Sequence, residues 1–352
     1  MIIYTRSPYF ITVDEAAQIG SRIELRLWNG TGSAPTGATY TFSKYAASTT
    51  QVENIYNISP FIKEYIDNVA PIYAAGETDS TSMWVNVQVK RYTEATLGTY
   101  TLLDTTTYLG TNGYTSFADG YNYTNSSSTF MLLSDNTKEI RYDITKDIPY
   151  VNVLINPDSG DVITAKYKDL RGRNEVTVNY TETKGMLKIP FSTTSIKYNK
   201  GNTLTISYND TVFIYKVTPV CEVKYSPVIC SYINRFGGWQ FLTFFKTRTD
   251  NIDIKGSNYN LLQDSINYNA SKGQSKSFNI NGKQTIKLSS GFVPENYSDL
   301  IQDLLLSETV LLDGKPVEVK TQGTTLKKAL QDKNINYEIE FDYAFNLINN
   351  AI

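Results

Sequence analysis

Histidine, the side chain that most often carries acid–base chemistry, does not occur in this sequence. Ser-His-Asp and Cys-His nucleophiles, imidazole acids or bases and histidine-bound metals are therefore excluded. Paired carboxylates of the glycosidase type need only Asp and Glu, so composition leaves that reaction open. Enzymes of that type commonly have a repetitive β-helix, and we find no repeat in the sequence. We therefore expect no enzymatic activity and no catalytic residues.

A possible site for a hard cation lies near the C-terminus, where Glu338, Glu340 and Asp342 alternate with apolar residues. Residues two apart on a strand share one face, and carboxylates suit hard cations. A row of this kind is more often the solvated side of an outer strand, and we adopt that interpretation. We expect no metal ion and no cofactor.

The two cysteines are Cys221 and Cys230, which are separated by eight residues. This spacing matches neither the C-x-x-C redox motif nor the ligand set of a zinc site. A chain of this size can be stabilised by core burial, so we expect two reduced and buried thiols, and a disulfide between them remains open.

Aromatic residues are densest directly after the glycine pair Gly237-Gly238. One explanation is a glycine turn that leads into a buried strand. The other is an exposed surface for association or for stacking on sugars. The extended, proline-containing segment Met1–Phe10 is a second place where we expect contact with a neighbouring subunit. The candidate interface residues are Arg6, Pro8, Tyr9, Phe10, Trp239, Phe241 and Phe245.

Composition limits the class of protein and its partners. Hydrophobic residues make up 41% of the chain and charged residues 19%, which is enough apolar material for packed cores. The formal net charge is −2 and the basic residues are scattered, so sequence-specific nucleic-acid binding is not expected. No stretch approaches the ~20 apolar residues that span a bilayer, so membrane insertion is not expected either. The 27 tyrosines favour sheets and interfaces.

Alternation and turn residues predict two β-sandwich domains in the first two thirds of the chain. Residues 1–128 form the N-terminal sandwich, in which 22–28 is a half-buried strand and Ser59-Pro60 starts a short helix that runs to Val69. Residues 129–222 contain about seven short strands at intervals near ten residues, which is typical of an immunoglobulin or fibronectin type III sandwich.

Residues 223–352 form a different, α+β module. Its amphipathic helix follows Pro294, a hairpin turns at Asp313-Gly314, and a strand covers 337–343. The predicted fold class is therefore mainly β, with tandem immunoglobulin/fibronectin-like β-sandwich domains and a C-terminal α+β module with one amphipathic helix.

Short motifs are spread over nearly the whole chain in a characteristic order. They are Arg6-Ser7-Pro8-Tyr9-Phe10, Leu27-Trp28-Asn29-Gly30, Ile58-Ser59-Pro60-Phe61-Ile62, Gly113-Tyr114 through Asp119-Gly120, Ile233-Asn234-Arg235-Phe236-Gly237, Gly291-Phe292-Val293-Pro294-Glu295, Leu304-Leu305-Leu306-Ser307-Glu308, and Ile335-Asn336-Tyr337 through Ala344-Phe345. In order and spacing the chain resembles structural proteins of the tail, or of the rings between portal and tail, in crAss-like phages and related tailed phages of Bacteroidetes. The stretch from Thr129 to Val220 carries none of these motifs.

The resemblance implies a non-catalytic virion protein that is present in many copies around the tail axis. The partners it implies are further copies of the chain, in a sixfold or twelvefold ring, and other tail, portal or ring proteins. The location it implies is the tail or neck of the virion, after synthesis in the host bacterial cytoplasm. Two alternatives remain, a receptor- or carbohydrate-binding protein at the tail periphery and a tail-associated glycan hydrolase. An exposed Trp239 or a tyrosine cluster in a cleft would favour the first alternative.

Overall fold

The computed structural model describes residues 1–48, 50–68, 82–123, 130–134, 139–143, 146, 148–155, 162–180, 184–193, 200–220, 226–261, 271, 273–323 and 335–349. Most of this chain is β-strand, as the predicted fold class requires. The helices in the described part are α1 (Ser59–Lys63), α2 (Tyr297–Leu305) and a 3-10 helix, Phe117–Asp119. None of them is long and apolar enough to cross a membrane.

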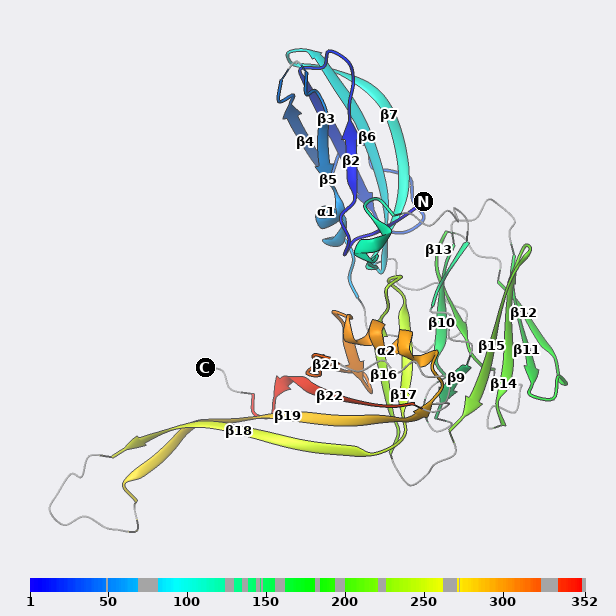
Figure 1. Ribbon diagram of the computed structural model, residues 1–352, viewed down its shortest axis with the longest axis vertical. Coiled ribbons are helices and arrows are strands. Elements are labelled where there is room, and N and C mark those ends of the chain that lie inside the picture. The colour runs from blue at the N-terminus through cyan, green and yellow to red at the C-terminus, as the bar shows by residue number, and fades with distance from the viewer. Residues whose placement is uncertain are drawn as a thin grey trace.

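Each sheet takes all its strands from one of the three predicted domains (Figure 1). Residues 128–129 and 222–223, at the two predicted boundaries, lie outside the described residues, so the boundaries themselves stay predictions.

The N-terminal domain is a sandwich of two unequal sheets. The larger has the order β1 (Ile2–Tyr4), β7 (Thr99–Thr111), β6 (Trp84–Thr96), β3 (Gly20–Trp28), β4 (Tyr40–Tyr45), and the smaller pairs β2 (Phe10–Val13) with β5 (Asn54–Asn57). Alternation along β3 places Ile23, Leu25 and Leu27 in the core, as predicted. β1 pairs, in parallel, with only Leu109 to Thr111 of β7. The same edge of β7 from Thr99 to Tyr108 therefore has no strand beside it in the described chain.

Helix α1 is shorter than predicted. It begins at the expected Ser59-Pro60 pair, but beyond Lys63 the backbone bonds change to the tighter spacing of three residues, from Ile66 N–H to Lys63 C=O. The predicted end at Val69 lies outside the described residues.

The central domain packs a three-stranded sheet against a five-stranded sheet. Their orders are β13 (Gly185–Pro190), β10 (Tyr150–Ile155), β8 (Phe130–Leu133) and β12 (Val176–Tyr180), β11 (Ile163–Asp169), β14 (Asn202–Tyr208), β15 (Thr211–Pro219), β9 (Glu139–Tyr142). The sandwich predicted here is confirmed, and only β8 was missed. β8 is an unbroken run of four apolar residues, so it shows no alternation of apolar and polar residues by which a strand is recognised.

The C-terminal domain is built on one seven-stranded sheet. Its order is β17 (Trp239–Phe244), β16 (Val228–Ile233), β20 (Val310–Leu312), β21 (Lys315–Val319), β22 (Ile335–Asn346), β19 (Ser275–Val293), β18 (Arg248–Asn260). Helix α2 packs on it through Tyr297, Leu300, Ile301 and Leu304, which is the apolar face that the sequence predicted. Asp313 and Gly314 both have positive φ, 45° and 77°, in the predicted tight turn between β20 and β21.

A long hairpin, which the sequence did not predict, leaves this sheet and extends far from the body of the molecule (Figure 1). We call it the arm. It consists of β18 and the residues of β19 that pair with it, Ser275–Leu288. Every residue of β18 is exposed, and β18 is the last strand of the sheet.

Candidate functional site

The carboxylate row near the C-terminus pairs with lysines rather than surrounding an ion site. Glu338 lies 2.6 Å from Lys287, and Glu340 lies 2.9 Å from Lys320. The hydrogen bond to Glu338 raises the pKa of Lys287, and the bond to Glu340 raises the pKa of Lys320. Among the described residues, no three His, Cys, Asp or Glu side chains are grouped so that they could hold a metal ion.

Cys230 is a free thiol that is fully buried in the core of the C-terminal domain. Burial raises the pKa of this thiol, which leaves it protonated and unreactive at neutral pH. This matches the predicted buried, reduced cysteine. Cys221 lies outside the described residues.

The N-terminal segment, which we predicted to dock on a neighbouring subunit, is instead built into its own domain. Ile3 is fully buried and Tyr9 is only 7% exposed, both in the N-terminal core. Pro8 is exposed, and Phe10 is half-buried with its ring 5.2 Å from that of Tyr121. Tyr9 is therefore packed in the core of its own domain, whereas contact of Arg6, Pro8 and Phe10 with a neighbouring subunit stays a prediction.

The aromatic stretch after Gly238 is also buried, so the explanation by a buried strand is correct. Trp239 is 1% exposed, and Phe241 and Phe245 are nearly as well covered. Trp239 donates its backbone N–H to Asn152 Oδ1 of the central domain over 2.9 Å. These residues were predicted as an interface between subunits, and the structure makes them an interface between domains of one chain.

All three domains meet in one hydrophobic cluster, which we call the interdomain junction. It contains residues of β1, β6, β7, β8, β10, β13, β16, β17 and β20 together with Met83. Its members are Ile2, Tyr4, Met83, Trp84, Leu109, Met131, Leu133, Tyr150, Leu154, Met186, Ile229, Ile233, Trp239, Phe241 and Leu311. Because these side chains come from three separate sheets, the junction fixes the domains relative to one another.

Glycines let the three backbones approach closely at the junction. A Cβ on Gly113 would lie 2.5 Å from Arg235 O, and one on Gly238 would lie 2.7 Å from Leu133 Cβ. Gly237 has φ of +84°, and a Cβ there would lie 2.8 Å from Asn112 N. Only glycine fits this combination of a left-handed backbone and a close neighbour.

A polar layer connects the N-terminal domain to the end of helix α2. Glu308 accepts from Arg6 Nε at 3.2 Å and from Lys63 Nζ at 2.8 Å. Burial would raise the pKa of Glu308, but Lys63 and Arg6 outweigh it and lower the pKa. Tyr114 donates its hydroxyl to Asp303 Oδ1 at 3.0 Å, and burial together with Asp303 raises the pKa of that hydroxyl.

Several of the motifs that carry the resemblance come together here although they are far apart in the sequence. They are the segments 6–10, 58–62, 113–120, 233–237 and 304–308. Ser59 donates to Ser7 O at 2.6 Å, and Tyr114 N–H donates to Arg235 O at 2.8 Å. The motifs therefore describe how the domains are joined, rather than a site for a ligand.

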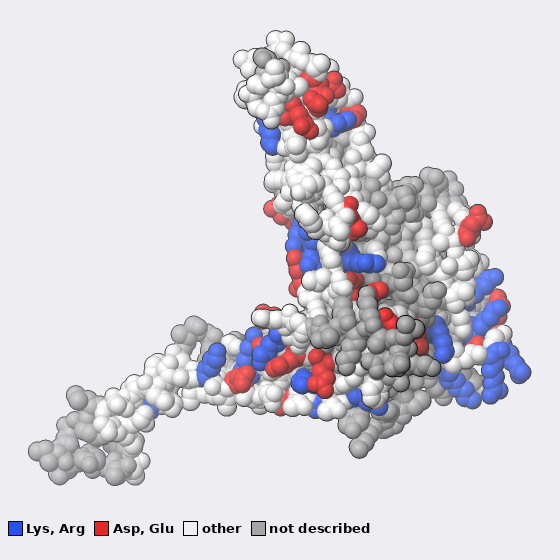
Figure 2. Space-filling view, viewed as in Figure 1, with Lys and Arg blue, Asp and Glu red and all other residues white. Residues whose placement is uncertain are grey.

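The arm differs from the junction because its apolar side chains lie in solvent. Ile252 is 58% and Ile254 is 70% exposed, and both lie on one face because they are two residues apart. Charged side chains gather over the inner half of the arm, whereas the outer half shows almost none on this face of the molecule (Figure 2). Ile252 and Ile254 alternate with polar residues, and so do Phe278 and Ile280. This alternation is the sequence signal that could have predicted these strands.

The end of the described chain extends the apolar surface of the arm. Asn281 exchanges two hydrogen bonds with Ile348, at 2.9 and 3.1 Å, and Leu347 N–H donates to Gly282 O at 2.8 Å. A Cβ on Gly282 would lie 2.9 Å from Leu347 and 3.5 Å from Ile252, so these two side chains lie side by side. Leu347 and Ile348 are themselves exposed.

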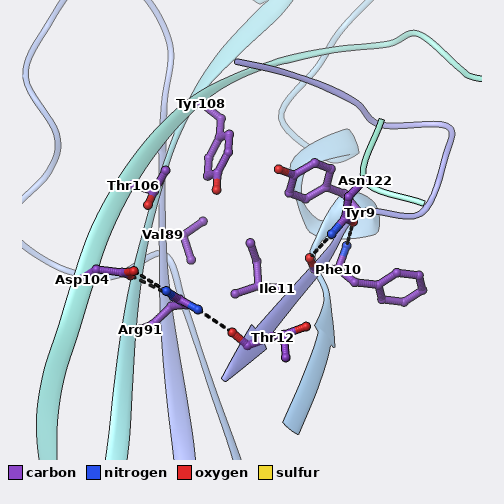
Figure 3. A pocket seen from close by; sticks show the side chains of 10 residues that line it. All are labelled: Tyr9, Phe10, Ile11, Thr12, Val89, Arg91, Asp104, Thr106, Tyr108 and Asn122. Carbon is purple, nitrogen blue, oxygen red and sulfur yellow. Dashed lines mark hydrogen bonds and ion pairs between the residues drawn. The ribbon is translucent and has the colours of Figure 1, made fainter. Parts of the chain in front are cut away.

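A groove of about 290 Å³ opens on the N-terminal domain between β2 and β7 (Figure 3). Its apolar lining includes Ile11 and Val89, which are buried. One end is bounded by Arg91, which donates to Thr12 O at 2.7 Å and to Asp104. The groove lies beside the part of β7 that has no strand next to it. The full lining is Tyr9, Phe10, Ile11, Thr12, Val89, Arg91, Asp104, Thr106, Tyr108 and Asn122.

The charged groups of the groove and the side chain of Asn122 are already paired within the chain. The hydrogen bond from Arg91 lowers the pKa of Asp104, so this carboxylate is ionised and neutralised. Asn122 brackets the backbone of Phe10, accepting from its N–H at 2.6 Å and donating to its C=O at 2.8 Å. Burial, together with Tyr108, raises the pKa of Tyr9. The groove therefore combines apolar surface from Ile11 and Val89 with polar side chains, and its one carboxylate is already paired.

Comparison with known proteins adds little to this picture. No family model matches the chain, and no curated protein matches it. The crystal structure of CBD12 from CALX1.2 is 10% identical with a TM-score of 0.16, and the match covers 58% of this chain and 75% of that chain. The calcium binding domain CBD12 of CALX1.1 is 7% identical with a TM-score of 0.17, covering 59% and 75%. Similarities this low carry no argument, and nothing that those proteins bind is transferred to this chain.

Proposed function

We propose that this chain is a non-catalytic structural subunit of a tailed-bacteriophage virion, in the tail or in the head–tail connector rings. It acts by assembling with further copies of itself and with other virion proteins. The observation that carries the proposal is the arm, a hairpin that leaves the body with isoleucines in solvent. Burying these isoleucines against a neighbouring subunit is favourable by about 25 cal/mol per Å² of apolar surface removed from water. In the single chain, where they are exposed, they contribute no such stabilisation.

The interdomain junction supports the same role. A subunit of a ring must hold two different faces at a fixed angle, because a heterologous interface closes only if each rotation is the same. Burial of Trp239 and the close backbone approach at Gly113 and Gly238 join the domains into one body. Such a body holds the angle between its faces fixed. Two of the motifs that resemble phage ring and tail proteins, 113–120 and 233–237, meet beside this junction, where Tyr114 N–H donates to Arg235 O at 2.8 Å.

A receptor- or carbohydrate-binding protein at the tail periphery is the second candidate. Trp239 is buried and offers no platform for a sugar. Tyr9 and Tyr108 line the groove, however, and Tyr121 is exposed beside it. Glycan binding there should change tyrosine fluorescence, and replacing Tyr121 with alanine should remove the change. A glycan hydrolase needs two carboxylates, and Asp104 is the one carboxylate among the groove's lining residues.

The proposal is tested by shortening the arm and measuring the mass of the protein. Asp253 and Lys283 face each other across the hairpin, so residues 254–282 can be replaced by an Asn-Gly turn. Light scattering and negative-stain microscopy at rising concentration should give rings or larger oligomers for the full chain and monomers for the shortened chain. Circular dichroism should show that both chains are folded. Equal assembly of the two chains would remove the arm from the proposal, and a full chain that stays monomeric at every concentration would contradict self-assembly.

A further inference from the structure

The arm offers a long strand edge that no strand of the described chain covers. β18 has thirteen residues, all exposed, which corresponds to roughly 43 Å at 3.3 Å per residue. Its inner edge pairs with β19, and its outer edge pairs with no described strand. Ile252 and Ile254 project to one face, while Asp253 and Lys255 project to the other. Exposed, partly apolar edges of this length normally receive a partner strand, because unpaired edges promote association.

The N-terminal domain offers a second open edge, on the opposite side of the molecule from the arm (Figure 1). β1 covers only the end of β7, and the edge from Thr99 to Tyr108 pairs with no strand among the described residues. This edge is roughly 33 Å long at 3.3 Å per residue, so most of β18 would fit along it. A strand added there would close the side of the sandwich, and its inward side chains would enter the groove.

We propose that β18 of one copy adds to the open edge of β7 in a second copy, and that Ile252 or Ile254 fills the groove between β2 and β7. Both edges belong to this chain, and the arm projects away from its own N-terminal domain, so the partner is a second copy. The inference rests on the proposed function and deepens it, because it names the two surfaces that meet.

The chemistry of the two edges is compatible. The floor of the groove is formed by Ile11 and Val89, and about 290 Å³ of space lies above it. Asp104 is already neutralised by Arg91, so an incoming isoleucine does not cover an unpaired charge. Exposed threonines alternate along the outer face of this part of β7, and with Ile252 and Ile254 turned toward the groove the arm presents Asn251, Asp253 and Lys255 on that face. These side chains can form hydrogen bonds with threonine hydroxyls. The exposed threonines are Thr99, Thr101, Thr105 and Thr107.

This contact is heterologous, because an arm meets a groove rather than another arm. Each copy has one donor edge and one acceptor edge, so the same contact repeats from copy to copy. If the rotation that relates one copy to the next divides a full turn into equal steps, the repeated contact closes into a ring. Any other rotation gives a filament.

Disulfide trapping between two singly substituted chains tests the contact directly. One chain carries Ile254→Cys or Ile252→Cys and the other carries Thr106→Cys, and the two are mixed before mild oxidation. A disulfide forms only where the Cβ atoms of the two cysteines are about 4 Å apart. We therefore expect a covalent dimer only in the mixture, where the arm of one chain can lie against β7 of the other. Ile214→Cys, on an exposed strand of the central domain, replaces the arm residue in the control mixture and should give none.

Each other outcome of the trapping experiment overturns the contact. A dimer formed by Ile254→Cys alone would show that arms pair with arms. Oligomers without any mixed disulfide would show that the chain assembles by another surface, which leaves the proposed function standing. A protein that stays monomeric at all concentrations would overturn the contact and the self-assembly together.

A charge placed on the arm gives a quantitative check. Ile254→Lys should raise the concentration at which half the chains are assembled by about tenfold or more, which is ~1.4 kcal/mol per tenfold. Ile214→Lys, a matched change at an isoleucine that is 56% exposed, should leave that concentration unchanged. Equal effects of the two substitutions would overturn the assignment of Ile254 to the groove.

Discussion

The interdomain junction and the arm contain the same kinds of residue but use them in opposite ways. Trp239 and Phe241 are covered by other domains of the same chain, whereas Ile252 and Ile254 remain in solvent. A glycine leaves room for a close neighbour in both places, for Leu133 at Gly238 in the junction and for the side chain of Leu347 at Gly282 in the arm. The difference shows that a dense aromatic stretch indicates close packing but does not tell whether the partner surface belongs to the same chain. The exposed fraction of the side chains in the folded chain distinguishes packing within the chain from a surface that is left for a partner.

The largest expected effect breaks the junction. Trp239→Ala should lower the free energy of unfolding by ~3–5 kcal/mol, because a large buried side chain leaves a cavity. Urea denaturation of the monomer measures it. If Trp239 were instead a contact between subunits, the monomer would keep its stability and only assembly would weaken.

A second prediction concerns the close approach at Gly237. Gly237→Ala should cost about 2–4 kcal/mol, because left-handed strain adds to a clash with Asn112. Gly98→Ala is the matched control, since Gly98 has φ of +78° but nothing within 4 Å of the added Cβ. That change should cost only about 1 kcal/mol from backbone strain. Similar losses in the two variants, measured by thermal denaturation, would mean that the domains do not touch at Gly237.

Local patterns predicted most strands because apolar alternation, apolar runs and turn residues are visible within each segment. The alternation at Ile23, Leu25 and Leu27, the turn at Asp313-Gly314 and the apolar face of α2 depend only on neighbours in sequence. The same reasoning failed where the partner lies far away. Tyr9 and Trp239 meet residues of distant segments, so the sequence shows that they are apolar but not what covers them.

The arm escaped prediction for a different reason. Ile252 and Ile254 alternate with polar residues as in any half-buried strand, and periodicity cannot show that the apolar face lacks a sheet or helix above it. The groove was missed because it depends on how far β1 extends along β7, which is set by pairing rather than by residue type.

A smaller effect tests the polar layer of the junction through pH. The pKa of Glu308 is lowered in the folded chain, so its contribution to stability is present above its unfolded pKa of about 4.3 and is lost as pH falls through the folded value. Glu308→Gln should therefore be less stable than the wild type at pH 7, by no more than ~1 kcal/mol because the pair is partly exposed. The two proteins should converge once the pH falls below the folded pKa of Glu308. Glu318→Gln is the control, since Glu318 is 71% exposed on its pair with Lys283, and a gap that persists in acid would contradict the ion-pair assignment.

The smallest expected effect on stability is at the arm, and it completes the comparison. Ile254→Ser should change the free energy of unfolding of the monomer by no more than ~0.5 kcal/mol, because an exposed side chain loses little on replacement. The same variant should assemble less well, because its serine is too short to pack against Ile11 and Val89 in the groove of a neighbour. Denaturation and light scattering on one preparation separate the two quantities. A loss of stability without a loss of assembly would mean that Ile254 packs within its own chain. The arm, like the interdomain junction, would then be a contact within one chain and not a surface for a neighbour.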